Sequence, residues 1–219
     1  MYADLENRKQ QLIRKALQGS AFFAEIDADP IGDLTTGATS DLSPLPSGYD
    51  DLGWLTDEGI AFAGDTSQSD ITSFGATTPT RSDITAETTT LTVVAQETKL
   101  RTIGLITGAR DSAITADATT GEVRIDKPER PSARYYRVLA LAVDESDSGA
   151  EIYIARFLPR AKVTSKTAPN FAGGDNAITY GVTLTGFKDS VLGYTESWIF
   201  GGPGWKELLT DMGIPSTTP

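Results

Sequence analysis

Carboxylates are the side chains in this sequence whose spacing is suited to catalysis. Asp50 and Asp51 lie close to Asp57 and Glu58, and paired carboxyl groups of this kind can act as the acid and base of a glycosidase. All four occur in turn-like sequence beside glycines, where solvated turn residues are the commoner identity. The sequence contains no cysteine and no histidine, which excludes thiol nucleophiles, imidazole bases and thiolate zinc sites. We therefore predict that the chain is not an enzyme.

Two further patterns resemble ligand sites only weakly. The segments 27–33 and 144–149 place aspartates at alternating positions, but both lack the downstream glutamate of a calcium loop. The glycine-rich segment 201–205 has no phosphate-binding lysine, and a tight turn is the better explanation for it. We predict that the protein binds no metal and no cofactor.

Three tryptophans, Trp54, Trp198 and Trp205, could form a platform on which sugar rings stack. Large aromatic side chains at strand ends are more often core or interface anchors. A β-sandwich adhesion or carbohydrate-binding module therefore remains the alternative to a protein that assembles with its own copies. The absence of disulfides and of an apolar export signal after the charged N-terminus counts against that alternative.

Composition limits the possible partners. The 219 residues carry 19 basic and 30 acidic side chains, for a net charge of −11, and Lys and Arg are dense only between residues 8 and 15. Proteins that bind nucleic acid through its phosphates need a basic face, so we expect no specific binding of nucleic acid. The apolar runs are too short to cross a bilayer, and we expect no membrane insertion.

The strand that should organise the fold is rich in threonine and spans residues 85–98. Its alternation is typical of a sheet with one wet side. One face is apolar and the other is hydroxylic: Leu91, Val93 and Ala95 against Thr88, Thr90 and Thr92. Further strands are expected at 21–27, 122–126, 133–143, 150–163, 177–187 and 191–200.

Helices are expected to be few. A narrow apolar stripe predicts an N-terminal helix over 4–18 with Asp4 as its candidate N-cap. Three-residue spacing predicts a short helix from Leu100 that Gly108 ends. The C-terminal segment after 201 should form one short helical turn. The chain is therefore mainly β: a β-sandwich or partly closed barrel of about eight strands with one short helix packed on it. We divide it into an N-terminal arm or helix, 1–20, and a single β domain, 21–219.

The long segment 30–53 has little periodicity. A connection of this length inside a compact domain tends to be functional. Its apolar side chains are spaced along it and could dock on another molecule: Ile31, Leu34, Leu42 and Leu45. We predict a docking loop.

Three passages together resemble the major tail tube protein of long-tailed bacteriophages, particularly those that infect actinobacteria. They are SAFFAEIDADPIGD leading to YDDLGWLTDEGIAF, then RSDITAETTTLTVVAQETKL, and finally GYTESWIFGG. The resemblance runs from about Gly19 to the C-terminus. It implies a tail-tube-like fold and hexameric rings that stack into a hollow tube through which phage DNA passes without specific binding.

The same resemblance implies further partners and a location. The partners would be other tail proteins, such as the tape measure, tail terminator and tail tip. The location would be the virion tail, assembled in the host cytoplasm. Ring stacking is then expected to use the docking loop, namely Ile31, Leu34, Leu42 and Leu45, together with Trp54.

A set of lumen-facing residues follows as a hypothesis. If Ile152 and Ile154 are buried, alternation turns Glu151 outward, and burial of Leu139 and Leu141 would expose small residues on the same wet face. A smooth acidic wall would repel DNA. The residues assigned to it are Thr88, Thr90, Thr92, Glu151, Asp144 and Glu145.

Overall fold

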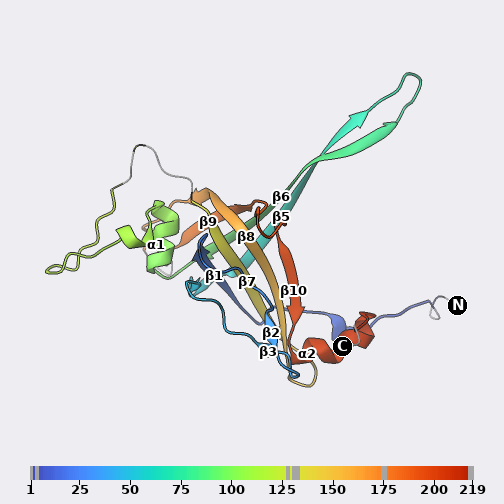
Figure 1. Cartoon of the computed structure of the whole chain (residues 1–219), viewed down its shortest axis with the longest axis horizontal. Coiled ribbons are helices and arrows are strands. Elements are labelled where there is room, and N and C mark those ends of the chain that lie inside the picture. Colours follow the sequence, from blue (N-terminus) through green and yellow to red (C-terminus); the bar gives the residue numbers. More distant parts are fainter. Residues whose placement is uncertain (1, 3–4, 127–128, 130–133, 174–176, 217–219) are drawn as a thin grey trace.

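One open antiparallel sheet organises the protein (Figure 1). The computed structural model describes residues 2, 5–126, 129, 134–173 and 177–216. The strands, in spatial order, are β4 (Asp50–Asp51), β1 (Gln18–Glu25), β7 (Tyr136–Glu145), β8 (Glu151–Thr167), β9 (Tyr180–Gly186), β6 (Arg81–Ala95) and β5 (Leu55–Ile71). An eighth strand, β10 (Ser197–Gly201), pairs with β8, and β2 (Thr35–Thr36) pairs with β3 (Asp41–Leu42) in a separate ribbon. The expected mainly β class is confirmed.

The main core lies on one face of this sheet. Leu91, Val93 and Ala95 of β6 are all buried there, as the alternation in the sequence predicts. The helix α1 (Leu100–Thr107) covers the same face with Leu105, and it ends at Gly108 in the left-handed conformation. The predicted short helix and its glycine stop are confirmed.

A second core lies on the opposite face of β7 and β8. Leu139, Leu141 and Phe157 are buried there beneath Ile31 and Leu34 of the long loop. The middle of the β7–β8 hairpin is thus covered on both sides, which explains its nearly continuous apolar sequence. The prediction of a wet face at this hairpin is wrong for that stretch.

The helix α2 (Pro203–Met212) is longer than the single turn that the sequence suggested. Its first turn packs directly on the start of β8. A Cβ atom at Gly204 would lie 2.4 Å from the carbonyl oxygen of Ala150, so only glycine permits this approach. Gly204 in the glycine-rich segment therefore allows the close packing of α2 on the start of β8.

Three expected elements differ from the structure. Within the described part of residues 4–18, the chain is mostly irregular, with one 3₁₀ turn, η2 (Gln10–Leu12), and Asp4 lies outside the described residues. The segment 122–126 forms no strand but only an isolated bridge between Ala116 and Val123. The last strand is confined to β10 and pairs with β8 rather than with its sequence neighbour β9.

Candidate assembly surfaces

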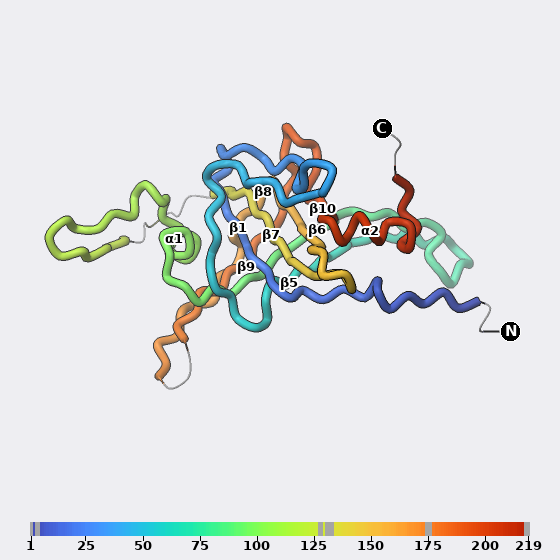
Figure 2. The backbone as a smooth tube through the Cα atoms, turned by 90° about the horizontal axis from the view of Figure 1, so that it is seen from below, coloured from blue at the N-terminus to red at the C-terminus, as the bar shows by residue number. Residues whose placement is uncertain are grey.

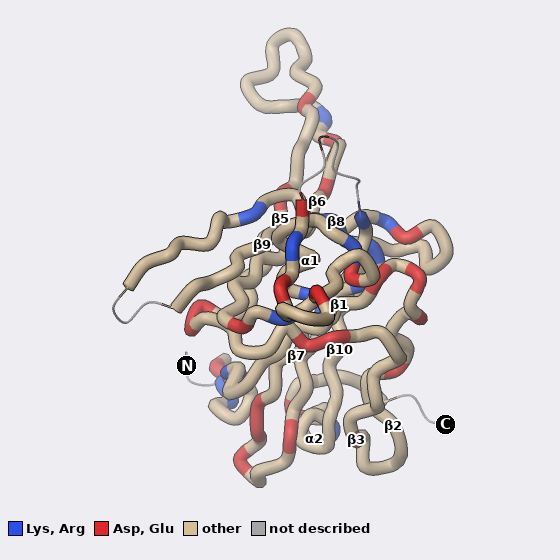
Figure 3. Tube along the Cα trace, turned by 90° about the vertical axis from the view of Figure 1, so that its left-hand side faces the viewer, with Lys and Arg blue, Asp and Glu red and all other residues tan. Residues whose placement is uncertain are grey.

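A two-stranded arm projects far from the sheet. It consists of residues 64–88, where β5 and β6 continue beyond the last rung that β6 shares with β9, Thr90–Thr185. Every residue from 63 to 88 is exposed, and Phe74 at the tip is fully exposed. Figures 1 and 3 both show the arm leaving the end of the molecule opposite α2 and the β2–β3 ribbon.

One side of the arm continues the core face of the sheet. Phe62 pairs with Leu91 at the arm's base, and the same side then carries Glu87 opposite Thr66. Further out it carries Gln68 opposite Ile84 and Asp70 opposite Ser82. We call this the core-side face of the arm. Ile84 is 67% exposed on it, so a face that is buried within the subunit runs on uncovered into solvent.

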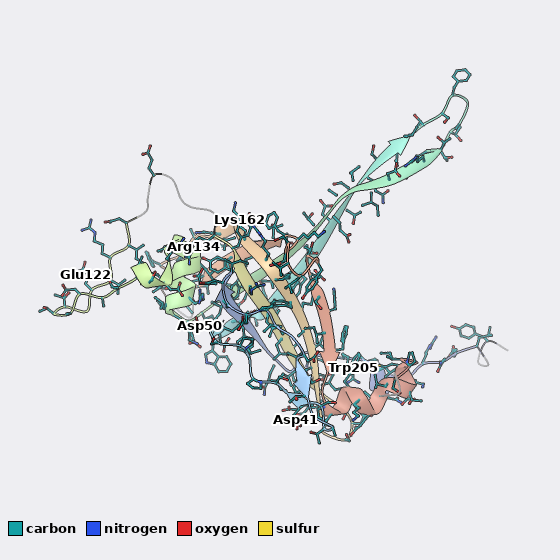
Figure 4. The ribbon with its side chains drawn as sticks, in the orientation of Figure 1. Asp41, Asp50, Glu122, Arg134, Lys162 and Trp205 are labelled. Atoms are coloured by element: carbon teal, nitrogen blue, oxygen red, sulfur yellow. The ribbon has the colours of Figure 1, made fainter. Side chains whose placement is uncertain are left out.

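The other side of β6 is hydroxylic, as predicted. Thr88 and Thr90 each donate a hydrogen bond of 3.3 Å across to β5, to the carbonyls of Asp65 and Ala63. Thr92 lies 3.0 Å from Thr183 of β9, oxygen to oxygen. Lys162 of β8 pairs with Thr185 on this same side, so the hydroxyl face also carries a cation (Figure 4).

The tip of the β7–β8 hairpin holds two of the predicted wall residues. Glu145 and Glu151 face each other on the last rung, and both are exposed. The register places Glu151 on the face of Leu141, not on the face of the small residues Ala140 and Ala142. The expectation that Glu151 shares a face with these alanines is therefore wrong.

Tyr153 and Asp144 show how that hairpin tip is fixed. Tyr153 donates its hydroxyl to Glu151, and burial together with this bond raises the pKa of Tyr153 to about 12. Asp144 is buried and forms an ion pair of 3.2 Å with Arg14. In the single subunit the carboxylate of Asp144 is thus engaged by the N-terminal segment.

The docking-loop residues fall into two groups. Ile31 and Leu34 are buried in the second core and hold the loop onto the sheet. Leu45 is partly buried against the same core, whereas Leu42 and Trp54 are exposed, Trp54 to 77%. Within the loop, the outward apolar surface is thus carried by Leu42, with Trp54 just beyond the loop's end.

A cavity of about 360 Å³ lies between this loop and β10. Its lining combines the apolar side chains of Ile31, Leu34, Phe157 and Ile199 with the polar residues Asp33, Thr35, Tyr194 and Ser197. Asp33 supplies its one carboxylate, so the cavity holds no acid–base pair.

Stacked rings run along β10 to α2. The guanidinium of Arg156 lies between Phe62 and Trp198, 3.7 and 4.1 Å from their ring centroids. Trp198 stacks on Phe200 at 6.1 Å, and Phe200 stacks on Trp205 at 4.9 Å. Two of the three tryptophans thus belong to one stack, in which a guanidinium covers one face of Trp198 and Trp205 covers one face of Phe200.

The carboxylates that could have been catalytic have structural roles or stand alone. Asp50 binds Arg101 at 2.8 Å, and Asp51 accepts a hydrogen bond from the Gly53 amide. Asp57 and Glu58 are exposed on β5. Within the described ranges, acidic side chains form no group that could hold a metal ion.

Arg101, itself buried, is the centre of a charge cluster beneath α1. It binds Glu25 at 3.0 Å and Asp111 at 3.1 Å in addition to Asp50, and Arg134 binds the same Glu25. Burial raises the pKa of Asp111 despite the neighbouring arginine. The cluster joins α1 to β1 and β4, and sequence reasoning did not identify it because its members are far apart in the chain.

The N-terminal segment 5–17, which we call the strap, leaves β1 and runs beside α2 (Figure 2). Lys9 binds Asp211 of α2 at 2.6 Å, and the amide of Leu17 donates to the carbonyl of Val143. Its basic residues thus attach it to the body of the subunit.

Comparisons with known proteins give loose similarity. No protein-family model and no curated protein matches the chain. A cryo-EM structure of the anti-feeding prophage cap, the AFP tube terminating cap, is 11% identical with a TM-score of 0.43, covering 91% of this chain and 99% of that one. A crystal structure of an Hcp protein is 9% identical with a TM-score of 0.32, covering 82% and 98%. In the described part of the chain, the helices are all too short or too polar to span a membrane.

Proposed function

We propose that this chain is a structural subunit that assembles with its own copies into rings, which stack into a hollow tube. The observation that carries the proposal is the arm, whose core-side face extends a buried surface into solvent. A long exposed ribbon with open edges is an aggregation hazard unless a neighbour covers it. A neighbouring copy that receives the arm removes that hazard.

The position of the arm favours a head-to-tail contact. It projects from one end of the molecule, whereas α2 and the β2–β3 ribbon lie at the other (Figure 3). A contact between two different surfaces of identical subunits generates closed rings or continuing stacks, depending on the rotation between copies. Both outcomes are needed in a tube.

The finer proposal follows the sequence resemblance described above. The rings are hexameric, and the tube is the phage tail through which DNA reaches the host. Tape measure, terminator and tail tip proteins meet its ends in the virion, after assembly in the host cytoplasm. DNA crosses the lumen without specific binding, in keeping with the net charge of −11.

Two sets of residues have roles in this proposal. The lumen is lined by the hydroxyl face, Thr88, Thr90 and Thr92, with Glu145 and Glu151 near the rim. Asp144 supports that rim through its ion pair with Arg14. Stacked rings meet through Leu42, Leu45 and Trp54, while Ile31 and Leu34 hold the loop in place.

The test is the state of association of the concentrated full chain. Negative-stain electron microscopy should show rings or tubes, and sedimentation should show the matching large species. A variant in which Asn-Gly replaces residues 66–87 should stay monomeric, because the arm is gone while the core remains. A matched control replaces residues 117–122, between the paired Ala116 and Val123, by the same turn and should still assemble. A wild-type chain that stays strictly monomeric at high concentration contradicts the proposal.

A further inference from the structure

The strap presents an unusual surface. Two of its basic side chains, Lys9 and Arg14, face the body of the subunit and form ion pairs with Asp211 and Asp144. Three of its apolar side chains are exposed to solvent: Leu5 to 82%, Ile13 to 76% and Leu17 to 54%. An extended segment with this inverted arrangement has its apolar surface available for another molecule.

The outward residues of the strap form a stripe. Ile13 has extended backbone angles, and in extended chain every second side chain lies on the same face. Ile13, Lys15 and Leu17 are exposed, as is the small Ala16, whereas Arg14 is half-buried in its ion pair. The stripe is therefore apolar, cationic and apolar, with a step of about 6.6 Å for each two residues.

The core-side face of the arm carries the complementary order. Glu87, Ile84 and Asp70 lie on successive or nearby rungs of that face. Thr66, opposite Glu87, and Asp70 are four residues apart on β5, a distance of about 13 Å. That is also the distance from Ile13 to Leu17 in extended chain. The two stripes thus share a step, and a displacement of one step between them places Ile13 or Leu17 opposite Ile84 and Lys15 opposite an acid.

The net charges of the two segments also match. The strap has four basic residues and one acid, for a net charge of +3, in a chain whose overall charge is −11. The arm, residues 64–88, has four acids and one arginine, for a net charge of −3. Lys9 and Arg14 form ion pairs within the subunit, and Arg8 pairs with Glu6 at 3.3 Å, so the charge left to meet a partner is that of the exposed Lys15.

We infer that the strap of one copy binds the core-side face of a neighbouring copy's arm. The inference rests on the proposed function and names the surface that receives the arm. Ile13 or Leu17 covers Ile84, and Lys15 pairs with Glu87 or Asp70. The contact joins two copies because the strap and the arm of one chain leave the sheet at different ends (Figures 1 and 3).

Cysteine cross-linking tests the contact directly, since the chain has no cysteine of its own. Ile13→Cys and Leu17→Cys are each tested against Ile84→Cys; the two variants of a pair are made in separate full-length chains, mixed at assembling concentration and oxidised. Intact mass then separates the mixed disulfide dimer from the two homodimers. We expect the mixed dimer above its statistical share for the strap residue that covers Ile84. Thr88→Cys, on the opposite face of the arm, replaces Ile84→Cys as the matched control and should give only the statistical share.

Charge reversal supplies a second measurement. Lys15→Glu alone and Glu87→Lys alone should each raise the concentration needed for assembly about two- to fivefold, the range of an exposed ion pair. Both changes in one chain should restore the wild-type value. This rescue is not expected if either residue acts only on the stability of its own subunit.

Each outcome decides the inference. Mixed dimers at the statistical share, or a doubly reversed chain no better than the worse single variant, overturn it while leaving the proposed function intact. Preferential cross-linking of Ile84→Cys to Trp198→Cys also overturns it, and assigns the arm to the aromatic stack on β10. A wild-type chain that never assembles removes both the proposed function and the inference.

Discussion

Ile84 and Glu87 lie on the same face of the arm, although three positions along the chain separate them. In a regular strand an odd separation places two side chains on opposite faces. Thr85 is an extra residue between two rungs that are consecutive on β5, and this bulge changes the phase of the strand. The bulge thus sets which side chains of the arm share a face.

Insertion of one threonine between Ser67 and Gln68 should therefore disrupt assembly without unfolding the subunit. The inserted residue gives Thr85 a partner on β5, so the ribbon becomes regular and Ile84, three positions from Glu87, moves to the opposite face. Sedimentation should show monomers, with circular dichroism like that of the wild type. The control, deletion of Thr85, also removes the bulge but leaves Ile84 opposite Gln68 and on the face of Glu87, and should assemble.

Replacement of Leu91 by alanine should cost the isolated subunit about 2–5 kcal/mol in unfolding free energy. Leu91 is fully buried in the main core, where the surrounding side chains would leave a cavity. Thr88→Ala on the exposed face of the same strand should change stability by about 0.5 kcal/mol or less. Urea denaturation of unassembled protein measures both. Equal effects would show that the two faces of β6 have been misassigned.

Gly204→Ala should destabilise the packing of α2 by about 1–3 kcal/mol. The added Cβ would meet the carbonyl oxygen of Ala150 at 2.4 Å and the side chain of Ile152 at 2.8 Å. Gly32→Ala is the control, since a Cβ there meets nothing within 4 Å. Thermal unfolding should separate the two variants, and an unchanged Gly204→Ala melt contradicts the close contact.

Acid should loosen the strap. Hydrogen bonds from Lys9 and Gln11 hold the pKa of Asp211 below its ordinary value of 3.8. A carboxyl group whose folded pKa is lowered stabilises the docked state above 3.8, and this stabilisation is lost as pH falls through the folded pKa. Asp211→Asn mimics the loss at neutral pH. NMR relaxation should then show greater motion at residues 9–11, whereas Asp147→Asn at the exposed hairpin tip should leave them unchanged.

Chemical labelling can locate the hydroxyl face. Thr88→Cys in assembled tubes should react with a small maleimide but not with a maleimide carried on a protein too large for the bore. The unassembled variant should react with both reagents, because Thr88 is exposed in the subunit. Equal reaction of tubes with both reagents places Thr88 on the outside and removes it from the proposed lumen.

The organising strand β6 was predictable because burial alternates strictly along its inner part. Leu91, Val93 and Ala95 follow the period of a half-buried strand, and all three are core residues. The β7–β8 hairpin was equally clear, with turn residues between two apolar runs. Which of its side chains point to which face of the sheet was not predictable. Both sides of the middle of the hairpin are buried, so an alternation of apolar and polar residues is missing there.

Other elements escaped prediction for identifiable reasons. The outer part of β5 is polar on both faces, so nothing in residues 64–71 indicated a strand. The strap mimics a helical stripe, but Leu5, Ile13 and Leu17 are exposed and its attachment comes from ion pairs with distant residues. Such pairings are invisible to any local pattern, and the pairing of β10 with β8 is another example.

The arm has a kinetic consequence. A two-stranded ribbon without a core is marginally stable in water, so ordering it against a neighbour costs conformational entropy at every new contact. When the first few subunits associate, few contacts form to offset this entropy cost. A subunit that joins an existing ring forms contacts on several sides, so its addition is more favourable. Polymerisation should therefore show a lag, a critical concentration and strong acceleration by preformed seeds. The presence of such a seed would then determine where and when the protein polymerises, even when free subunits are abundant.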